Sequence, residues 1–321
     1  MTLALRARSR RLASCLVAAP ALLALLAAGC RPRPPADDPL DDFAYQLQNL
    51  DLAALGATRF DLAVIDYSPD GSDERRFTAA QIAALANSPG GRKTVLAYLS
   101  IGEAEDYRWY WQSAWDADRD GEPDPGAPDW LGRSNPDWLG NYKVRYWYPA
   151  WQALVLAYLD RIIAAGFGGA YLDIIDAYEY WGPGGESGLN RPTTEAEMID
   201  FVRTLADHAR VTRSRPDFLV FPQNGERLGR NADYLGTISG IGREDVWYND
   251  NAPNPPSGID PVLADLDVFR AAGKPVLVID YVRQPDLIDD FYSRAQARGY
   301  VPYATVRDLD SLVINPGHEP D

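Results

Sequence analysis

The chain has 321 residues, of which 46% are hydrophobic and 24% charged, and this composition excludes a disordered, collagenous or polytopic membrane protein. Its 31 Lys and Arg are outnumbered by 46 Asp and Glu, so the formal net charge of −15 disfavours nucleic acid and anionic lipid as partners. The 2 His and 2 Cys exclude a histidine-rich or four-cysteine metal centre.

Residues 1–29 have the pattern of a secretory signal peptide: four arginines and no acid, followed by an apolar run from Leu12 to Ala28. The run ends in Leu-Ala-Ala-Gly-Cys at 26–30, which resembles a bacterial lipobox with cleavage before Cys30 and lipid on its sulfur. A plain signal peptide and an uncleaved anchor helix are the alternatives. A proline-rich stretch follows at 31–35, so we expect a lipid-anchored tether over 30–42.

The predicted signal peptide and lipobox also predict where the mature protein is located and the redox state of its cysteine. We expect a bacterial cell-envelope lipoprotein that faces the periplasm or the exterior and touches the membrane only through its N-terminal lipid. Cys15 lies inside the signal peptide, so Cys30 is the one cysteine left in the mature chain and no internal disulfide forms. Cleavage removes four arginines and no acid, which makes the mature protein more negative still.

Short apolar runs rich in Val, Ile, Leu and Tyr recur along the rest of the chain, as expected for strands of a parallel sheet buried on both faces. The sixth of these runs, Gly236–Ile241, has the weakest apolar pattern. The predicted strands are Phe43–Gln48, Phe60–Asp66, Thr94–Ser100, Ala170–Ile174, Phe218–Pro222, Gly236–Ile241, Pro275–Asp280 and Val301–Ala304.

Helical patterns alternate with these strands. Their boundaries come from N-cap residues such as Thr78, from the Asp-Pro start at 260 and from terminal glycines such as Gly166. The expected helices are Thr78–Ala86, Trp151–Ala165, Thr194–Arg210, Asp260–Ala272 and Asp286–Arg298.

Eight β-then-α units predict an α/β fold, a single (β/α)8 TIM barrel over residues 43–315 with an insertion at 104–150. A doubly wound open sheet is the alternative. It is weakened because no G-x-G-x-x-G follows the first strand.

Acidic residues follow most of the predicted strands. In a TIM barrel the C-terminal strand ends share one rim, so these acids are expected to crowd into one mouth. Such crowding costs free energy unless it serves a ligand or a reaction. The acids are Asp66, Glu103, Glu105, Asp173, Asp176, Glu226, Glu244, Asp245 and Asp280.

Paired carboxylates without a nucleophilic Ser or Cys favour glycoside hydrolysis. One carboxyl must hold a proton for the leaving oxygen while the other stays ionised, and crowding separates their pKa values in that way. Sugars also stack on flat aromatic rings, and we expect two or three of the loop aromatics to do this while the others cover the barrel. The candidates are Tyr107, Trp109, Tyr110, Trp111, Trp115, Tyr178, Tyr180, Trp181, Trp247 and Tyr248.

Several motifs together resemble one family. They are Tyr45–Gln48, Asp66-Tyr67, Tyr98–Glu105, Gly166–Asp176, Gln223–Glu226 and Asp280-Tyr281. The set is similar to the endo-α-1,4-polygalactosaminidases of glycoside hydrolase family 114, including their branch once described as cysteinyl-tRNA-synthetase-related. The similarity extends over about residues 43–310 and is most specific at Tyr98–Glu105 and Gly166–Asp176.

The resemblance implies a TIM-barrel enzyme that cleaves α-1,4-linked galactosamine-containing polysaccharide. We expect it to work without a catalytic cofactor and to be a monomer. It implies Asp173 as nucleophile or base and Glu226 as general acid/base. Asp176 ends the same strand as Asp173, and Glu244 is an alternative to Glu226. The residues expected to shape the cleft and bind sugar amines or hydroxyls are Asp66, Tyr67, Tyr98, Glu103, Asp176, Tyr178, Asn224, Glu244, Trp247, Asp280 and Tyr281.

A calcium-type loop lies inside the insertion. Asp116, Asp118, Asp120 and Asp124 occupy positions 1, 3, 5 and 9 of an EF-hand-like pattern, with Gly121 at position 6 for the sharp turn. Position 12 is Ala127, so the usual bidentate glutamate is missing. A structural calcium and a solvated acidic loop are both consistent with this pattern.

Two functions from different classes remain. The first is a surface-anchored hydrolase of an amino-sugar polymer, and the second is a non-catalytic carbohydrate-binding lipoprotein on the same barrel. The separation of the two carboxyls distinguishes them, because retaining enzymes need about 5–5.5 Å and inverting enzymes about 6.5–9.5 Å. Aminoacylation of tRNA is excluded by the anionic chain and the missing nucleotide-binding signature.

Overall fold

The computed structural model describes residues 40–321, which belong to one compact unit spanning Asp37–Asp321. The predicted signal peptide, the lipidated Cys30 and most of the predicted tether lie outside the described residues. Within residues 40–321, no helix combines the length and the apolar character needed to cross a membrane.

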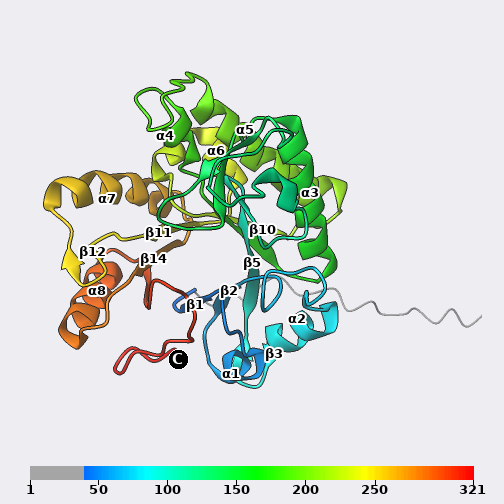
Figure 1. Cartoon of the computed structure of the whole chain (residues 1–321). Helices are drawn as coiled ribbons and strands as arrows, with labels where there is room; N and C mark the ends of the chain where they lie inside the picture. The colour runs from blue at the N-terminus through cyan, green and yellow to red at the C-terminus, as the bar shows by residue number, and fades with distance from the viewer. Residues whose placement is uncertain (1–39) are drawn as a thin grey trace, which may run out of the picture. The chain divides into compact units, whose positions relative to one another are not determined.

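Eight parallel strands follow one another in chain order around the centre of the molecule (Figure 1). The first five form one hydrogen-bonded sheet and the last three another. A parallel bridge between Gln223 and Gly242 joins the two sheets, and the rings of Phe43 and Tyr303, 5.5 Å apart, pack the last strand against the first. The strands are β1 (Phe43–Gln46), β2 (Leu62–Ile65), β5 (Thr94–Ser100), β9 (Gly169–Asp173), β10 (Leu219–Pro222), β11 (Ile241–Glu244), β14 (Val276–Asp280) and β15 (Val301–Ala304).

Helices connect successive strands, so the predicted α/β class and the succession of βα units are confirmed. No helix follows β15 among residues 305–321, which leaves the eighth unit without its helical half, contrary to the sequence prediction. The helices, labelled in Figure 1, are α1 (Leu52–Ala57), α2 (Ala79–Ala86), α3 (Pro149–Ala164), α4 (Ala177–Trp181), α5 (Thr194–Asp207), α6 (Ala232–Thr237), α7 (Pro256–Ala271) and α8 (Pro285–Ala297).

Local chemistry accounts for the helix starts. Thr78 and Gln81 form a reciprocal capping box at α2, and Asp51 accepts backbone N–H groups at the start of α1. Proline opens α3, α7 and α8, where its missing N–H has no helical partner to lose. Helix α7 begins at Pro256, earlier than predicted, and contains Pro261 in its second turn.

The sixth predicted strand, 236–241, is wrong. Residues 232–237 form α6, and β11 begins only at Ile241. The side chain of Asn231 accepts hydrogen bonds from the N–H groups of Asp233 and Tyr234, which starts a helix that is too short for a periodic sequence signal.

The segment between β5 and α3 carries its own three-stranded antiparallel sheet, in the order β6 (Glu103–Glu105), β8 (Asn141–Val144), β7 (Leu131–Ser134). A series of ring contacts fastens it to the barrel. Trp115 lies 5.3 Å from Trp130, and Trp130 lies 4.9 Å from Trp151 of α3. Several aromatics that the sequence offered as sugar platforms are therefore core residues, with Trp115, Trp181 and Trp247 all buried.

Candidate functional site

Asp173 ends β9 and is buried at 8% exposure. One carboxylate oxygen accepts the Tyr98 hydroxyl at 2.7 Å, and the other accepts the N–H of Ile174 at 2.8 Å. The parallel register explains this, because Tyr98 of β5 pairs with Tyr171, whose side chain shares a face with that of Asp173 two residues on. The strand ends thus hold the carboxylate in one orientation.

The turn after Asp173 is strained. Ile174 has a φ of +58°, and for a β-branched residue this conformation costs about 1–3 kcal/mol. A Cβ on Gly102 would lie 2.2 Å from the Ile174 carbonyl oxygen, so only glycine lets the β5 loop pass this turn. The motif Tyr98–Glu105, which contains Gly102, therefore packs against the motif Gly166–Asp176, which contains Ile174, beside Asp173.

Glu244 ends β11 and accepts a hydrogen bond from the hydroxyl of Tyr281. Burial raises the pKa of Asp173 well above its usual value, and the negative charge of Glu244 is the next largest cause. Burial also raises the pKa of Glu244. Glu244 is partly buried, and its negative charge lets Asp173 keep a proton at a pH where an isolated carboxyl would have lost it.

Tyrosines support this carboxyl pair from inside the barrel. The rings of Tyr45 and Tyr171 lie 5.2 Å apart. Burial raises the pKa of both phenols, and the charges of Asp173 and Glu244 add to the rise. A Cβ on Gly242 would lie 1.8 Å from the Tyr171 hydroxyl, so the glycine makes room for this phenol against β11. The sequence analysis did not identify Tyr45 and Tyr171 as site residues, although Tyr171 lies two residues before Asp173 and so shares its face.

Glu226 has different neighbours. It begins a 3₁₀ turn after β10 (Glu226–Arg230), and its Oε2 lies 3.3 Å from Nε of Arg243. Arg243 also donates to the side-chain oxygen of Asn224 at 2.9 Å. The nearby carboxylates that raise the pKa of Asp173 are those of Glu244 and Asp176. Arg243 was not predicted as a site residue. Its position directly before Glu244 at the end of a strand would have indicated it.

Asp176 stands at the start of α4, three residues after Asp173, and is partly buried. Burial raises its pKa to about 6, while the positive charge of Arg243 opposes that rise. The structure therefore brings together Tyr98, Asp173, Asp176, Asn224, Glu244 and Tyr281 of the predicted set.

Three other predicted acids have partners within the fold. Asp66 binds Arg108 with both oxygens, at 2.8 and 2.9 Å. Glu103 binds Nζ of Lys143 at 2.5 Å and the amide of Asn135 at 2.9 Å. Asp280 accepts three backbone N–H groups from 246–248, which fastens the loop after β11 to β14.

Three predicted aromatics are also packing residues. Tyr67 is fully buried against Tyr158, with the ring centres 4.7 Å apart. Trp247 lies on Phe291 of α8 at 5.8 Å. Tyr178 is buried and donates its hydroxyl to the carboxylate of Glu179 at 2.9 Å.

Arg108 is the cation of a buried ion cluster, in which it also binds Glu105 at 2.6 Å. We expect Arg108→Ala to lower the free energy of unfolding by about 3–5 kcal/mol, because Asp66 and Glu105 would stay buried without their cation. Arg75→Ala is the control, since Arg75 pairs with Asp70 at the surface and its loss is expected to cost about 1 kcal/mol or less. Urea denaturation measures both, and equal stability of the two variants would contradict this role.

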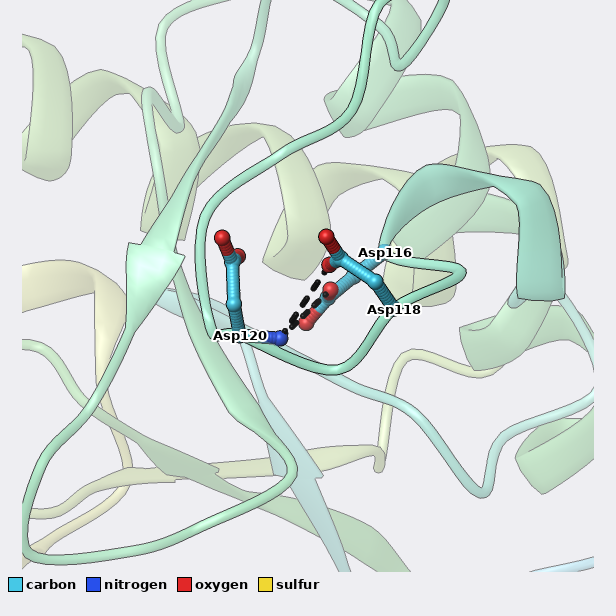
Figure 2. A group of neighbouring side chains, drawn as sticks. All are labelled: Asp116, Asp118 and Asp120. Atoms are coloured by element: carbon cyan, nitrogen blue, oxygen red, sulfur yellow. Dashed lines mark hydrogen bonds between the residues drawn. The ribbon is translucent and has the colours of Figure 1, made fainter.

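The predicted calcium loop brings together three of its four aspartates. Figure 2 shows Asp116, Asp118 and Asp120 around one turn, with carboxylate oxygens within 4.8 Å of one another. Burial raises the pKa of Asp116, but hydrogen bonds from Tyr142 and from the backbone of Gly121 outweigh it and keep this carboxyl ionised. The fourth predicted ligand, Asp124, accepts the N–H of Ala117 at 2.6 Å instead.

The chemistry available at the barrel mouth is acid–base and nucleophilic. Two carboxyls with raised pKa values can supply a proton donor and an ionised oxygen, the two groups needed to cleave a glycosidic bond.

Comparison with known proteins identifies the family. A model of glycoside-hydrolase family GH114 matches residues 25–319. A protein of Methanocaldococcus jannaschii, MJ1477, is 38% identical over 282 residues, which cover 84% of this chain and 77% of that protein. A protein of Deinococcus radiodurans is 40% identical over 265 residues, covering 82% and 79% of the two chains.

Solved structures share the fold. The glycoside hydrolase domain of PelA from Pseudomonas aeruginosa superposes with a TM-score of 0.62 at 22% identity, over 85% of this chain and 98% of that domain. Ega3 of Aspergillus fumigatus, solved in complex with galactosamine, gives a TM-score of 0.61 at 18% identity, over 84% and 93% of the two chains. The chain belongs to glycoside-hydrolase family GH114, and a polysaccharide is the substrate class that this membership implies.

Proposed function

We propose that this protein hydrolyses α-1,4-linked galactosamine-containing polysaccharide at the mouth of its barrel. The observation that carries the proposal is the pair of Asp173, which is buried, and Glu244, which is partly buried and whose negative charge raises the pKa of Asp173. The galactosamine bound to Ega3, which has the same fold, supports the choice of sugar. The net charge of −15 suits a polymer that carries positive amino groups.

In the proposed mechanism, Asp173 is the nucleophile or base and Glu244 is the general acid/base. Burial and the charge of Glu244 raise the pKa of Asp173, and the hydrogen bonds that Asp173 accepts from Tyr98 and Ile174 oppose this rise. Glu244 would give its proton to the departing glycosidic oxygen. The sequence predicts Glu226 for this second role, but the ion pair of Glu226 with Arg243 and the charge of Glu244 near Asp173 favour Glu244.

The test is to incubate the purified protein with galactosamine polymers and, separately, with glucosamine polymers, and to analyse the products by mass. Shorter oligomers from the galactosamine polymer alone are the expected result. Tight binding of the polymer without any cleavage would instead support the non-catalytic carbohydrate-binding function.

We also propose that the protein is a monomeric cell-envelope lipoprotein carried on Cys30. Its support is the sequence Leu-Ala-Ala-Gly-Cys at 26–30 after an apolar run. Metabolic labelling with a palmitate analogue tests this. Labelling of the wild type and its loss in Cys30→Ser are expected, whereas an unlabelled wild type would contradict the proposed anchor.

We further propose that Asp116, Asp118 and Asp120 hold a structural calcium ion, since their oxygens lie close together and the pKa of Asp116 is lowered. Chelation is expected to lower the Tm by about 5–10 °C, because a ligand at about 100 times its Kd contributes about 2.7 kcal/mol to the stability of a domain of this size. Differential scanning calorimetry measures the change. Asp118→Asn is expected to abolish the sensitivity to chelator, and an unchanged Tm of the fully chelated wild type would show that the loop binds no calcium.

A further inference from the structure

We propose that Arg307 is a positioning residue that holds the ring of Tyr281 in place, so that the Tyr281 hydroxyl stays directed at Glu244. The inference rests on the proposed function, because it explains how the proposed acid/base is oriented. Glu244 ends β11, Tyr281 directly follows β14 and Arg307 follows β15. These three strands are neighbours in one sheet, so the contacts join their C-terminal ends.

The loop after β11 fixes the guanidinium of Arg307 in one plane. Nη1 and Nη2 donate to the two carboxylate oxygens of Asp245 at 3.1 and 2.9 Å. Nη2 also donates to the side-chain oxygen of Asn249, and Nε donates to Asp250, both at 3.1 Å. A guanidinium bound through two parallel hydrogen bonds has little freedom to rotate.

This guanidinium lies over the ring of Tyr281. Its central carbon is 4.2 Å from the ring centre, within the range of a cation–π contact. Tyr281 is buried, and its hydroxyl donates to the carboxylate of Glu244. Within residues 40–321, Arg307 forms ion pairs with Asp245 and Asp250 and none with Glu244. Its contact with the proposed acid therefore runs through the Tyr281 ring.

The hydrogen bond from Tyr281 affects how firmly Glu244 holds its proton. Burial raises the pKa of Glu244, and this hydrogen bond is the next largest cause and opposes the rise. A Tyr281 ring that moved away would stabilise the ionised carboxylate less, so the pKa of Glu244 would rise further. The titratable and charged groups that interact with Glu244 come from several elements and are Tyr45, Tyr171, Asp173, Asp176, Arg243, Asp245, Tyr281 and Arg307.

The positive charge of Arg307 also lowers the pKa of Glu244 directly, so the test must separate charge from positioning. NMR titration of the purified protein with ¹³C-labelled glutamate measures this pKa, and Glu244→Gln assigns the signal. Arg307→Gln is expected to raise the pKa more in the wild-type background than in Tyr281→Phe, because the positioning effect needs the hydroxyl and the charge effect does not. Equal rises in both backgrounds would overturn the inference.

Arg307→Lys is a second variant that keeps the positive charge but loses the planar, two-bond pairing with Asp245. It is also expected to raise the pKa of Glu244, and an unchanged pKa would show that charge alone matters. Arg298→Gln is the matched control, since Arg298 is a similarly exposed arginine that pairs with Asp267 at 2.9 Å. It is expected to leave the pKa of Glu244 unchanged, and the Tm of each variant checks that it is folded.

Kinetics on a galactosamine oligomer separate this inference from the proposed function. In Arg307→Gln we expect kcat to fall about 10-fold with little change in KM, and the basic limb of the pH–rate profile to move to higher pH. A wild type that cleaves nothing, or a basic limb that stays fixed while the pKa moves, would contradict the proposed reaction of Glu244. The titration would still decide whether Arg307 positions Tyr281.

Discussion

Replacing Asp173 by asparagine is expected to reduce kcat for polymer cleavage by about 10⁴-fold or more, because the amide cannot act as a nucleophile or a base. The fold is expected to remain intact, since asparagine keeps an oxygen that can accept the Tyr98 hydroxyl. Product formation measured by reducing-end assay, with circular dichroism alongside, tests this. Asp233→Asn is the control, because Asp233 is an exposed acid of α6.

Tyr98→Phe is a milder variant than Asp173→Asn, because it keeps the Asp173 carboxylate and removes only one of its hydrogen bonds. The hydrogen bond from Tyr98 lowers the pKa of Asp173, so its removal is expected to raise that pKa and to move the acidic limb of the pH–rate profile to higher pH. Full activity in folded Asp173→Asn would show that Asp173 is not part of the mechanism. An acidic limb that does not move in Tyr98→Phe would show that the rate does not depend on the ionisation of Asp173.

Replacing Glu244 by glutamine is expected to reduce kcat by about 10²- to 10⁴-fold, the usual contribution of a general acid. The matched variant Glu226→Gln is expected to lose less than about 10-fold, because Glu226 would lose only a partly exposed ion pair with Arg243. Both substitutions preserve side-chain size. Steady-state kinetics on the same oligomer compares them directly.

The pH dependence gives this comparison a second readout. A general acid works only while protonated, so wild-type activity is expected to fall as pH rises through the pKa of Glu244. Burial raises that pKa, which places the basic limb above the usual range of a carboxyl, about 4.3 for glutamate. Glu244→Gln is expected to lose this limb. A collapse of activity in Glu226→Gln, with activity retained in Glu244→Gln, would return the acid role to Glu226.

The order of the elements was readable from the sequence because parallel strands buried on both faces need continuous apolar runs. Thr94–Ser100 and Val301–Ala304 match the observed strands residue for residue. The short helix α6 was not readable, since its start depends on the Asn231 cap and its six residues contain too few turns to show a period.

The acids at the strand ends were also identified from the sequence alone, because the barrel brings the C-terminal ends of its strands to one rim. Their partners were not. Asp66 meets Arg108 across 42 positions of the chain and Glu103 meets Lys143 across 40, so these two carboxylates are neutralised by contacts that no local pattern reveals. Asp173 and Asp176 come from one turn and Glu244 from another, and only the arrangement of the strands places the charge of Glu244 near the other two. The sequence by itself determined which acids follow the strands, while the tertiary structure decided which of them have partners within the fold, because desolvation and long-range ion pairing depend on neighbours that are distant along the chain.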